Sequence, residues 1–117
     1  MQAPSNITLN KSKTLLTLTF EGVEYPLSTE YLRVHSPSAE VVGHGPGQET
    51  LQTGKENVTI TRIEPTGNYA VVLFFSDGHD SGIYSWTHLH KLATEQDKLW
   101  SNYLARLKTA GHAHKQH

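Results

Sequence analysis

Two strand-like segments joined by a turn constrain the fold of this chain more than any other feature. Residues 58–63 are rich in β-branched side chains and alternate in polarity, and residues 69–75 are almost wholly apolar. Between them, Pro65-Thr66-Gly67-Asn68 has the composition of a turn. A continuous apolar run of this length is typical of a strand at the centre of a sheet. We therefore predict a central strand over 69–75 that is covered on both faces.

A second strand pattern lies nearer the N-terminus. Apolar and polar residues alternate up to Phe20 and again from Val23 to Leu27, and Glu21-Gly22 separates the two runs. A two-residue connection with glycine second predicts a β-hairpin. Pro26 has no N–H for a ladder, so the second strand of the hairpin is expected at a sheet edge. A shorter strand is expected around residues 7–9.

Two helices are predicted from their capping residues. Ser28 is a favoured N-cap, and it predicts a short helix from about Thr29 to His35. Ser85 can cap a longer C-terminal helix, in which apolar residues recur at spacings of three and four as far as Leu107. A capping pattern starting at Thr94 predicts a break in the longer helix near Ala93.

These elements define an α+β fold. We predict a small antiparallel sheet with a short helix after the first hairpin and a C-terminal helix packed on the sheet. The 117 residues suffice for one domain, and no linker or internal repeat divides them. The domain is expected to span 1–111, and 112–117 is expected to be a flexible tail that contains His112, His114 and His117.

Composition excludes several classes of protein. The chain has no cysteine, which excludes disulfides, thiolate zinc sites, a cysteine nucleophile and iron–sulfur ligation by its own thiols. Ten Lys and Arg balance eleven Asp and Glu without a basic cluster, which argues against nucleic-acid binding. No 18-residue apolar run suggests a membrane span, and no apolar leader segment is visible. We therefore expect a cytoplasmic protein.

The segment Asp77-Gly78-His79-Asp80-Ser81-Gly82 carries the densest group of reactive side chains. Two carboxylates flank an imidazole, an inventory suited to metal binding or acid–base chemistry. The alternative is a tight turn in which Asp77 and Asp80 accept backbone N–H bonds and both glycines take unusual φ angles. No paired nucleophile is visible, so we do not expect an enzyme.

The eight histidines are nearly as numerous as the ten Lys and Arg together. His88 and His90 should face different sides of a helix, so they cannot chelate one ion together. His35, His44 and His79 lie in or beside predicted loops and could converge through tertiary structure. A zinc site made of these three imidazoles is therefore the alternative functional hypothesis.

Several motifs together resemble one known family. They are Leu32-Arg33-Val34-His35-Ser36-Pro37-Ser38-Ala39-Glu40, Gly67-Asn68-Tyr69-Ala70, the segment from Asp77 through Ile83-Tyr84-Ser85-Trp86, and Leu89. Their order and spacing resemble the gamma-butyrobetaine hydroxylase-like N-terminal domain, whose stand-alone bacterial members form a domain of unknown function. The resemblance spans about residues 7–92 and implies a small sheet-rich α+β domain.

In that family the domain occurs alone, in front of 2-oxoglutarate-dependent oxygenases, or fused to P-loop iron–sulfur carrier proteins. In the oxygenases it is non-catalytic and holds a structural zinc through three cysteines and one histidine. The resemblance aligns the cysteines with Ser36, Ser38 and Val41 and the histidine with His79. Three of the four zinc ligands are thus replaced, and His79 alone is retained.

We predict from these observations a non-catalytic binding or accessory module, linked through family fusions to iron–sulfur protein maturation or to oxygenases. No cofactor is expected, and zinc at His79 is the alternative. The partner is expected to be a protein, and the chain itself a monomer or homodimer. Tyr84 and Trp86 are also candidates, although such aromatics commonly pack a helix onto a sheet. The candidate interaction surface comprises Arg33, His35, Asp77, His79, Asp80, Tyr84 and Trp86.

Overall fold

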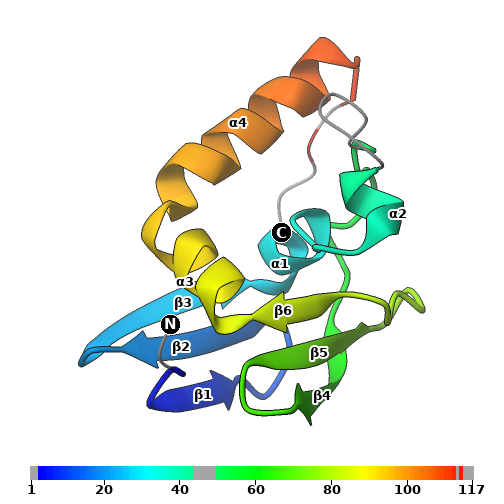
Figure 1. Cartoon of the computed structure of the whole chain (residues 1–117). Helices are drawn as coiled ribbons and strands as arrows, with labels where there is room; N and C mark the ends of the chain where they lie inside the picture. The colour runs from blue at the N-terminus through cyan, green and yellow to red at the C-terminus, as the bar shows by residue number, and fades with distance from the viewer. Residues whose placement is uncertain (1–2, 44–49, 113, 115–117) are drawn as a thin grey trace.

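The computed structural model describes residues 3–43, 50–112 and 114. Along the chain, the elements are β1 (Asn6–Leu9), β2 (Leu15–Phe20), β3 (Val23–Ser28), α1 (Thr29–Val34), α2 (Ala39–Val42), β4 (Ile60–Thr66), β5 (Ala70–Phe75), β6 (Ile83–Ser85), α3 (Trp86–Thr94) and α4 (Gln96–Thr109). The strands lie together and the helices gather on one side of them (Figure 1). This arrangement confirms the predicted α+β class.

The strands form two antiparallel sheets of three strands each. The first has the order β1-β2-β3, and its hairpin turn places Glu21 at φ 50° and Gly22 at φ 79°. Positive φ at both central residues is the geometry of a type I′ turn, which suits the twist of a hairpin. Pro26 lies on β3 at the edge of the sheet, as predicted.

The second sheet has the order β4-β5-β6, with β5 in the centre as predicted. Val71, Leu73 and Phe75 are buried on its inner face. Val72 and Phe74 point the other way and are only half-buried. The predicted burial of both faces therefore holds for the inner face, whereas the outer face is only partly covered. An apolar run does not reveal which of its two faces meets the core.

Both sheets contribute their inner faces to one hydrophobic core. Leu16, Leu18 and Phe20 of β2 and the inner residues of β5 belong to the same buried cluster. Helices α1 and α3 close this core with Tyr31, Leu32, Leu89 and Leu92. The sequence predicted one sheet because a periodicity of two identifies strands but not their partners.

The helix boundaries follow the predicted caps closely. Ser28 Oγ accepts the Tyr31 N–H (3.0 Å), and Ser85 Oγ accepts the His88 N–H (3.1 Å). The predicted break near Ala93 is present, because α3 and α4 meet at Glu95. Thr94 does not cap α4; its Oγ1 instead donates to the His90 carbonyl within α3. No helix in the described part of the chain is long and apolar enough to cross a membrane.

Candidate functional site

The Asp77–Gly82 segment is a structural turn that connects β5 to β6. Asp77 Oδ1 accepts the N–H of His79 (3.2 Å), and Gly78 has a φ of 87°. These contacts match the predicted turn for Asp77 and Gly78. Gly82 has no positive φ, so its role differs from the prediction: a Cβ there would lie 2.5 Å from Ser36 Oγ and 2.9 Å from Tyr84 Cε1. Asp80 is exposed and takes no part in these contacts.

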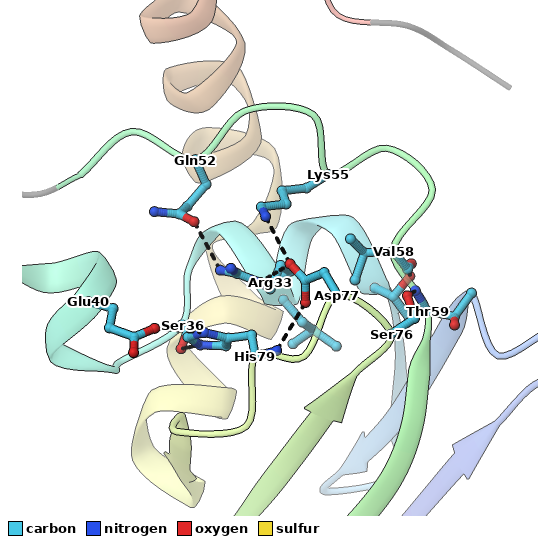
Figure 2. A network of polar contacts seen from close by, with 12 residues as sticks. Arg33, Ser36, Glu40, Gln52, Lys55, Val58, Thr59, Ser76, Asp77 and His79 are labelled. Carbon is cyan, nitrogen blue, oxygen red and sulfur yellow. Dashed lines mark hydrogen bonds and ion pairs between the residues drawn. The ribbon is translucent and has the colours of Figure 1, made fainter.

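Asp77 is the centre of a charged network that joins this turn to α1 (Figure 2). Its Oδ2 accepts from Arg33 Nε (3.0 Å) and from Lys55 Nζ (2.8 Å), and Arg33 also donates to Gln52 Oε1 (3.1 Å). Burial alone would raise the pKa of Asp77, but the hydrogen bonds from Lys55 and the His79 N–H and the charge of Arg33 outweigh it. Together they lower this pKa to about 2.

His79 is buried beside this network, with 6% of its surface exposed. Its Nδ1 lies 3.4 Å from Glu40 Oε2, and its Nε2 lies 2.8 Å from Ser36 Oγ. A carboxylate only accepts, so we place the proton on Nδ1, and Nε2 accepts from the Ser36 hydroxyl. Burial, followed by the charge of Arg33, lowers the pKa of His79. The imidazole is therefore neutral near pH 7.

The positions that the resemblance assigns to zinc lie close together. Ser36 Oγ contacts His79 and also accepts the Ser38 N–H (3.3 Å), and Ser38 Oγ lies 2.7 Å from Ser81 Oγ. Val41 contributes a buried apolar side chain. Two hydroxyls and an isopropyl group do not fit the thiolate donor set of such a zinc site. Hydrogen bonds, rather than thiolate ligands, join the segments here.

The alternative hypothesis from the sequence is a zinc site formed by His35, His44 and His79. His44 lies outside the described residues, so this combination stays a prediction. His35 Nδ1 donates to the Tyr31 carbonyl (2.8 Å), whereas His79 contacts Ser36. Among the residues that the structure describes, no group of three His, Asp or Glu is placed to hold a metal ion. Metal analysis of the purified protein would test the combination that includes His44.

The structure brings His35 together with His88, a pair that the sequence did not indicate. His88 Nε2 donates to the His35 carbonyl (2.9 Å), which links α3 to the end of α1. Burial lowers the pKa of both histidines. His90 instead packs edge-on against Phe20, with the ring centroids 5.1 Å apart. His88 and His90 thus contact different parts of the fold.

Much of the predicted interaction surface lies inside the protein. Tyr84 is fully buried, and its Oη donates to the Leu32 carbonyl (2.6 Å). Arg33 and His79 are each 6% exposed, so neither can contact a partner directly. Trp86 is half-buried and donates from Nε1 to the Asn68 carbonyl (2.8 Å). These motif residues therefore form hydrogen bonds between segments that are distant in sequence.

The family described as gamma-butyrobetaine hydroxylase-like, N-terminal, matches residues 7–90. The chain belongs to this family. The match covers both sheets, α1 and the Asp77 network, and it confirms the resemblance inferred from the motifs. No curated protein matches the chain.

Solved structures agree with the assignment. One protein with a solution NMR structure is 51% identical, with 97% of this chain and 90% of that chain covered and a TM-score of 0.84. Another is 47% identical, with 99% and 87% covered and a TM-score of 0.82. A crystal structure of a DUF971-family protein of unknown function from Acidithiobacillus ferrooxidans is 35% identical, with 79% and 93% covered and a TM-score of 0.63. The family is thus a stand-alone domain of unknown function.

The sequence did not indicate two members of the charged network. Gln52 and Lys55 lie between α2 and β4, in a polar stretch that has no local pattern. Only the fold places Lys55 beside the carboxylate of Asp77. A lone lysine before a strand carries no signal of its own, because lysines are common on solvated surfaces.

Proposed function

We propose that this protein is a non-catalytic accessory domain that binds a partner protein through the outer face of its second sheet. We define this outer face by Arg62, Glu64, Val72, Phe74 and Ile83. The observation that carries the proposal is that apolar residues from the two adjacent strands β5 and β6 are exposed or half-exposed together. Ile83 is 49% exposed, although it lies in a strand.

Strand register brings these residues onto one surface. Glu64 is opposite Val72, which in turn is opposite Ile83, and Arg62 is opposite Phe74. Directly opposed residues share a face of the sheet. The Arg62 guanidinium lies 5.5 Å from the centroid of the Phe74 ring, and Arg62 also pairs with Glu64. The outer face is thus an apolar strip with a charged border.

This composition suits a protein partner. Aromatic residues and arginine are enriched where proteins meet, and contiguous apolar surface on a folded protein commonly marks such a site. The absence of catalysis is supported by the use of Asp77, His79 and Arg33 in internal bonds. Arg33 and His79 are also nearly buried, which limits their access to a substrate.

The family supports the accessory role. Its description, gamma-butyrobetaine hydroxylase-like, N-terminal, names one end of longer proteins, which is compatible with a domain that assists another domain. The fusions implied by the resemblance point to a cytoplasmic iron–sulfur carrier or an oxygenase as the class of partner. Function within a family still depends on the surface of each member, so the outer face must be tested directly.

Site-specific crosslinking tests this proposal. A photoreactive amino acid at position 83 should capture a discrete partner in the native host, whereas one at Val23, which is 50% exposed on the first sheet, should not. With the purified partner, Ile83→Asp should weaken binding at least about tenfold, because a charge is placed in an apolar contact. Val23→Asp is the matched control and should leave binding unchanged.

Two results would contradict the proposal. Equal capture from positions 83 and 23 would show that the outer face is not selective. Binding by the purified partner that Ile83→Asp leaves unchanged would place the contact elsewhere. If the captured protein were a second copy of the chain, with a dimeric mass by light scattering, the face would be a homodimer interface instead. Melting temperatures of both variants should match the unmodified protein.

A further inference from the structure

A pocket of about 270 Å³ lies among the four described helices. The end of α1, together with α2, α3 and α4, surrounds it, and these helices lie above the sheets in Figure 1. No part of the predicted interaction surface except His35 contributes to it. The described lining residues are Val34, His35, Ser36, Val41, Val42, Thr50, His88, Lys91, Leu92, Leu99 and Arg106.

The pocket has an apolar floor and a basic mouth. Val34, Val41 and Leu92 are at most 7% exposed, and Leu99 is half-buried. Lys91 on α3 and Arg106 on α4 are exposed at its edge. A cavity with apolar walls and a few polar groups at one end is the usual form of a small-molecule site.

The positive charges at the mouth form no ion pair within the described part of the chain. No acidic residue is among the described lining residues, and neither Lys91 nor Arg106 forms an ion pair with a described residue. The two cations also repel a proton on His35, whose pKa they lower in addition to the effect of burial. An anion at the mouth would relieve this repulsion.

The two histidines are fixed in orientation. Each directs one ring N–H to a backbone carbonyl, that of Tyr31 for His35 and that of His35 for His88. The second ring nitrogen of each has no hydrogen-bond partner among the described residues. These imidazoles therefore form rigid walls whose remaining nitrogens are available to a polar group in the pocket.

We propose that this pocket binds a small aliphatic carboxylate, with its carbon chain on the apolar floor and its carboxylate between Lys91 and Arg106. A volume of about 270 Å³ lies just below the range typical of drug-sized ligands, which favours a small organic acid. The apolar floor favours an organic acid over inorganic phosphate, because phosphate would leave that surface unfilled. The proposal is independent of the outer face.

Titration followed by two-dimensional NMR of the full chain provides the test. With 3-methylbutanoate, we expect saturable shifts confined to residues around the pocket, among them Val41, Leu92 and Leu99. The neutral isostere 3-methylbutanamide should bind at least about tenfold more weakly, as expected when a charge-assisted contact is lost. N-acetyl-leucine tests whether the carboxylate comes from the end of a polypeptide, and it would then bind more tightly than 3-methylbutanoate.

Charge variants assign the binding to the proposed residues. Lys91→Gln and Arg106→Gln should each weaken 3-methylbutanoate binding by about tenfold, whereas Lys108→Gln, an exposed control on α4 that does not line the pocket, should have no effect. Equal binding of acid and amide would overturn the proposal. So would saturable binding of inorganic phosphate at the same residues, shifts that map outside the pocket, or affinity that neither pocket variant changes. Crosslinking at position 83 is unaffected by any of these results.

Discussion

The two sheets have the same construction but different outer faces. Each has three antiparallel strands and places alternate residues in the shared core. On the outer face of β1-β2-β3, the opposed rows are Leu15 and Ser28, then Thr8, Thr17 and Pro26, and then Asn6, Thr19 and Glu24, so this face is mostly polar but includes Leu15, which is 36% exposed. On the outer face of β4-β5-β6, the corresponding rows contain Val72 and Ile83 in one and Phe74 in the other.

This difference distinguishes residues that only have to suit a β-strand from residues that would also favour contact with a partner. Threonine is β-branched, so it suits a strand, and its hydroxyl also interacts with water. The first sheet, in which Leu15 is the one exposed large apolar side chain of the described outer rows, therefore has less to gain from a cover on its outer face. Valine, phenylalanine and isoleucine suit a strand equally well, but their removal from water is favourable in free energy. The second sheet, with Val72, Phe74 and Ile83 together on its outer face, therefore gains more from a cover than the first.

The largest expected effects test whether the inner faces are equivalent. Leu18 and Leu73 are both fully buried in the one core cluster, one from each sheet. Leu18→Ala and Leu73→Ala should each lower the free energy of unfolding by about 2–5 kcal/mol. Urea unfolding followed by circular dichroism measures this. Separate unfolding transitions for the two sheets would contradict a single core.

The next effect concerns the connection between the second sheet and α1. Asp77→Ala removes the carboxylate that compensates Arg33, whose side chain is only 8% exposed. The free energy of unfolding should fall by about 2–4 kcal/mol, because a nearly buried cation loses its partner. Asp80→Ala, three residues away and exposed, should change it by less than about 0.5 kcal/mol. Equal effects at both positions would refute the assigned role of Asp77.

A smaller effect should appear on mild acidification. Burial lowers the pKa of His35, His79 and His88 in the folded protein below that of an unfolded chain. As the pH falls through about 6.5, the unfolded chain takes up protons that the folded protein does not, so stability decreases. The urea midpoint should therefore be lower at pH 5.5 than at pH 7.5. None of these histidines lies in either sheet. The substitution His79→Gln should reduce the difference between the urea midpoints at pH 5.5 and pH 7.5. An unchanged midpoint would contradict the shifts.

The smallest effects on stability should come from the outer faces themselves. Ile83→Thr on the second sheet and Thr17→Val on the first exchange their chemistry, and each should change the free energy of unfolding by about 0.5 kcal/mol or less. Binding of the partner should nevertheless fall for Ile83→Thr and remain unchanged for Thr17→Val. A large loss of stability in Ile83→Thr would show that the outer face supports the fold.

Local signals predicted most of the elements, but not their assembly. Ser28 and Ser85 marked helix starts because a cap acts within three residues of itself. Glu21-Gly22 marked a hairpin for the same reason, since its turn requires only its own backbone angles. The division into two sheets could not be predicted, because whether the β4-β5 hairpin also pairs with the β2-β3 hairpin depends on long-range packing.

The candidate site was predicted only in part, for a related reason. The sequence singled out Arg33, Asp77 and His79 through their motifs, but not their burial. Lys91 and Arg106 lie on different helices, and no spacing in the chain relates them. The pocket they border depends on the packing of α3 and α4, which meet at Glu95, beside the end of α1.

By itself, the sequence determined the strands, the helix caps, the family and the absence of thiolate chemistry, because each depends on residue type or on neighbours along the chain. The tertiary structure decided which polar residues are internal, which sheet face stays open and which cations share a pocket. Burial and charge compensation depend on groups that are far apart in sequence. In this chain, Arg33 finds its carboxylate 44 positions away, at Asp77.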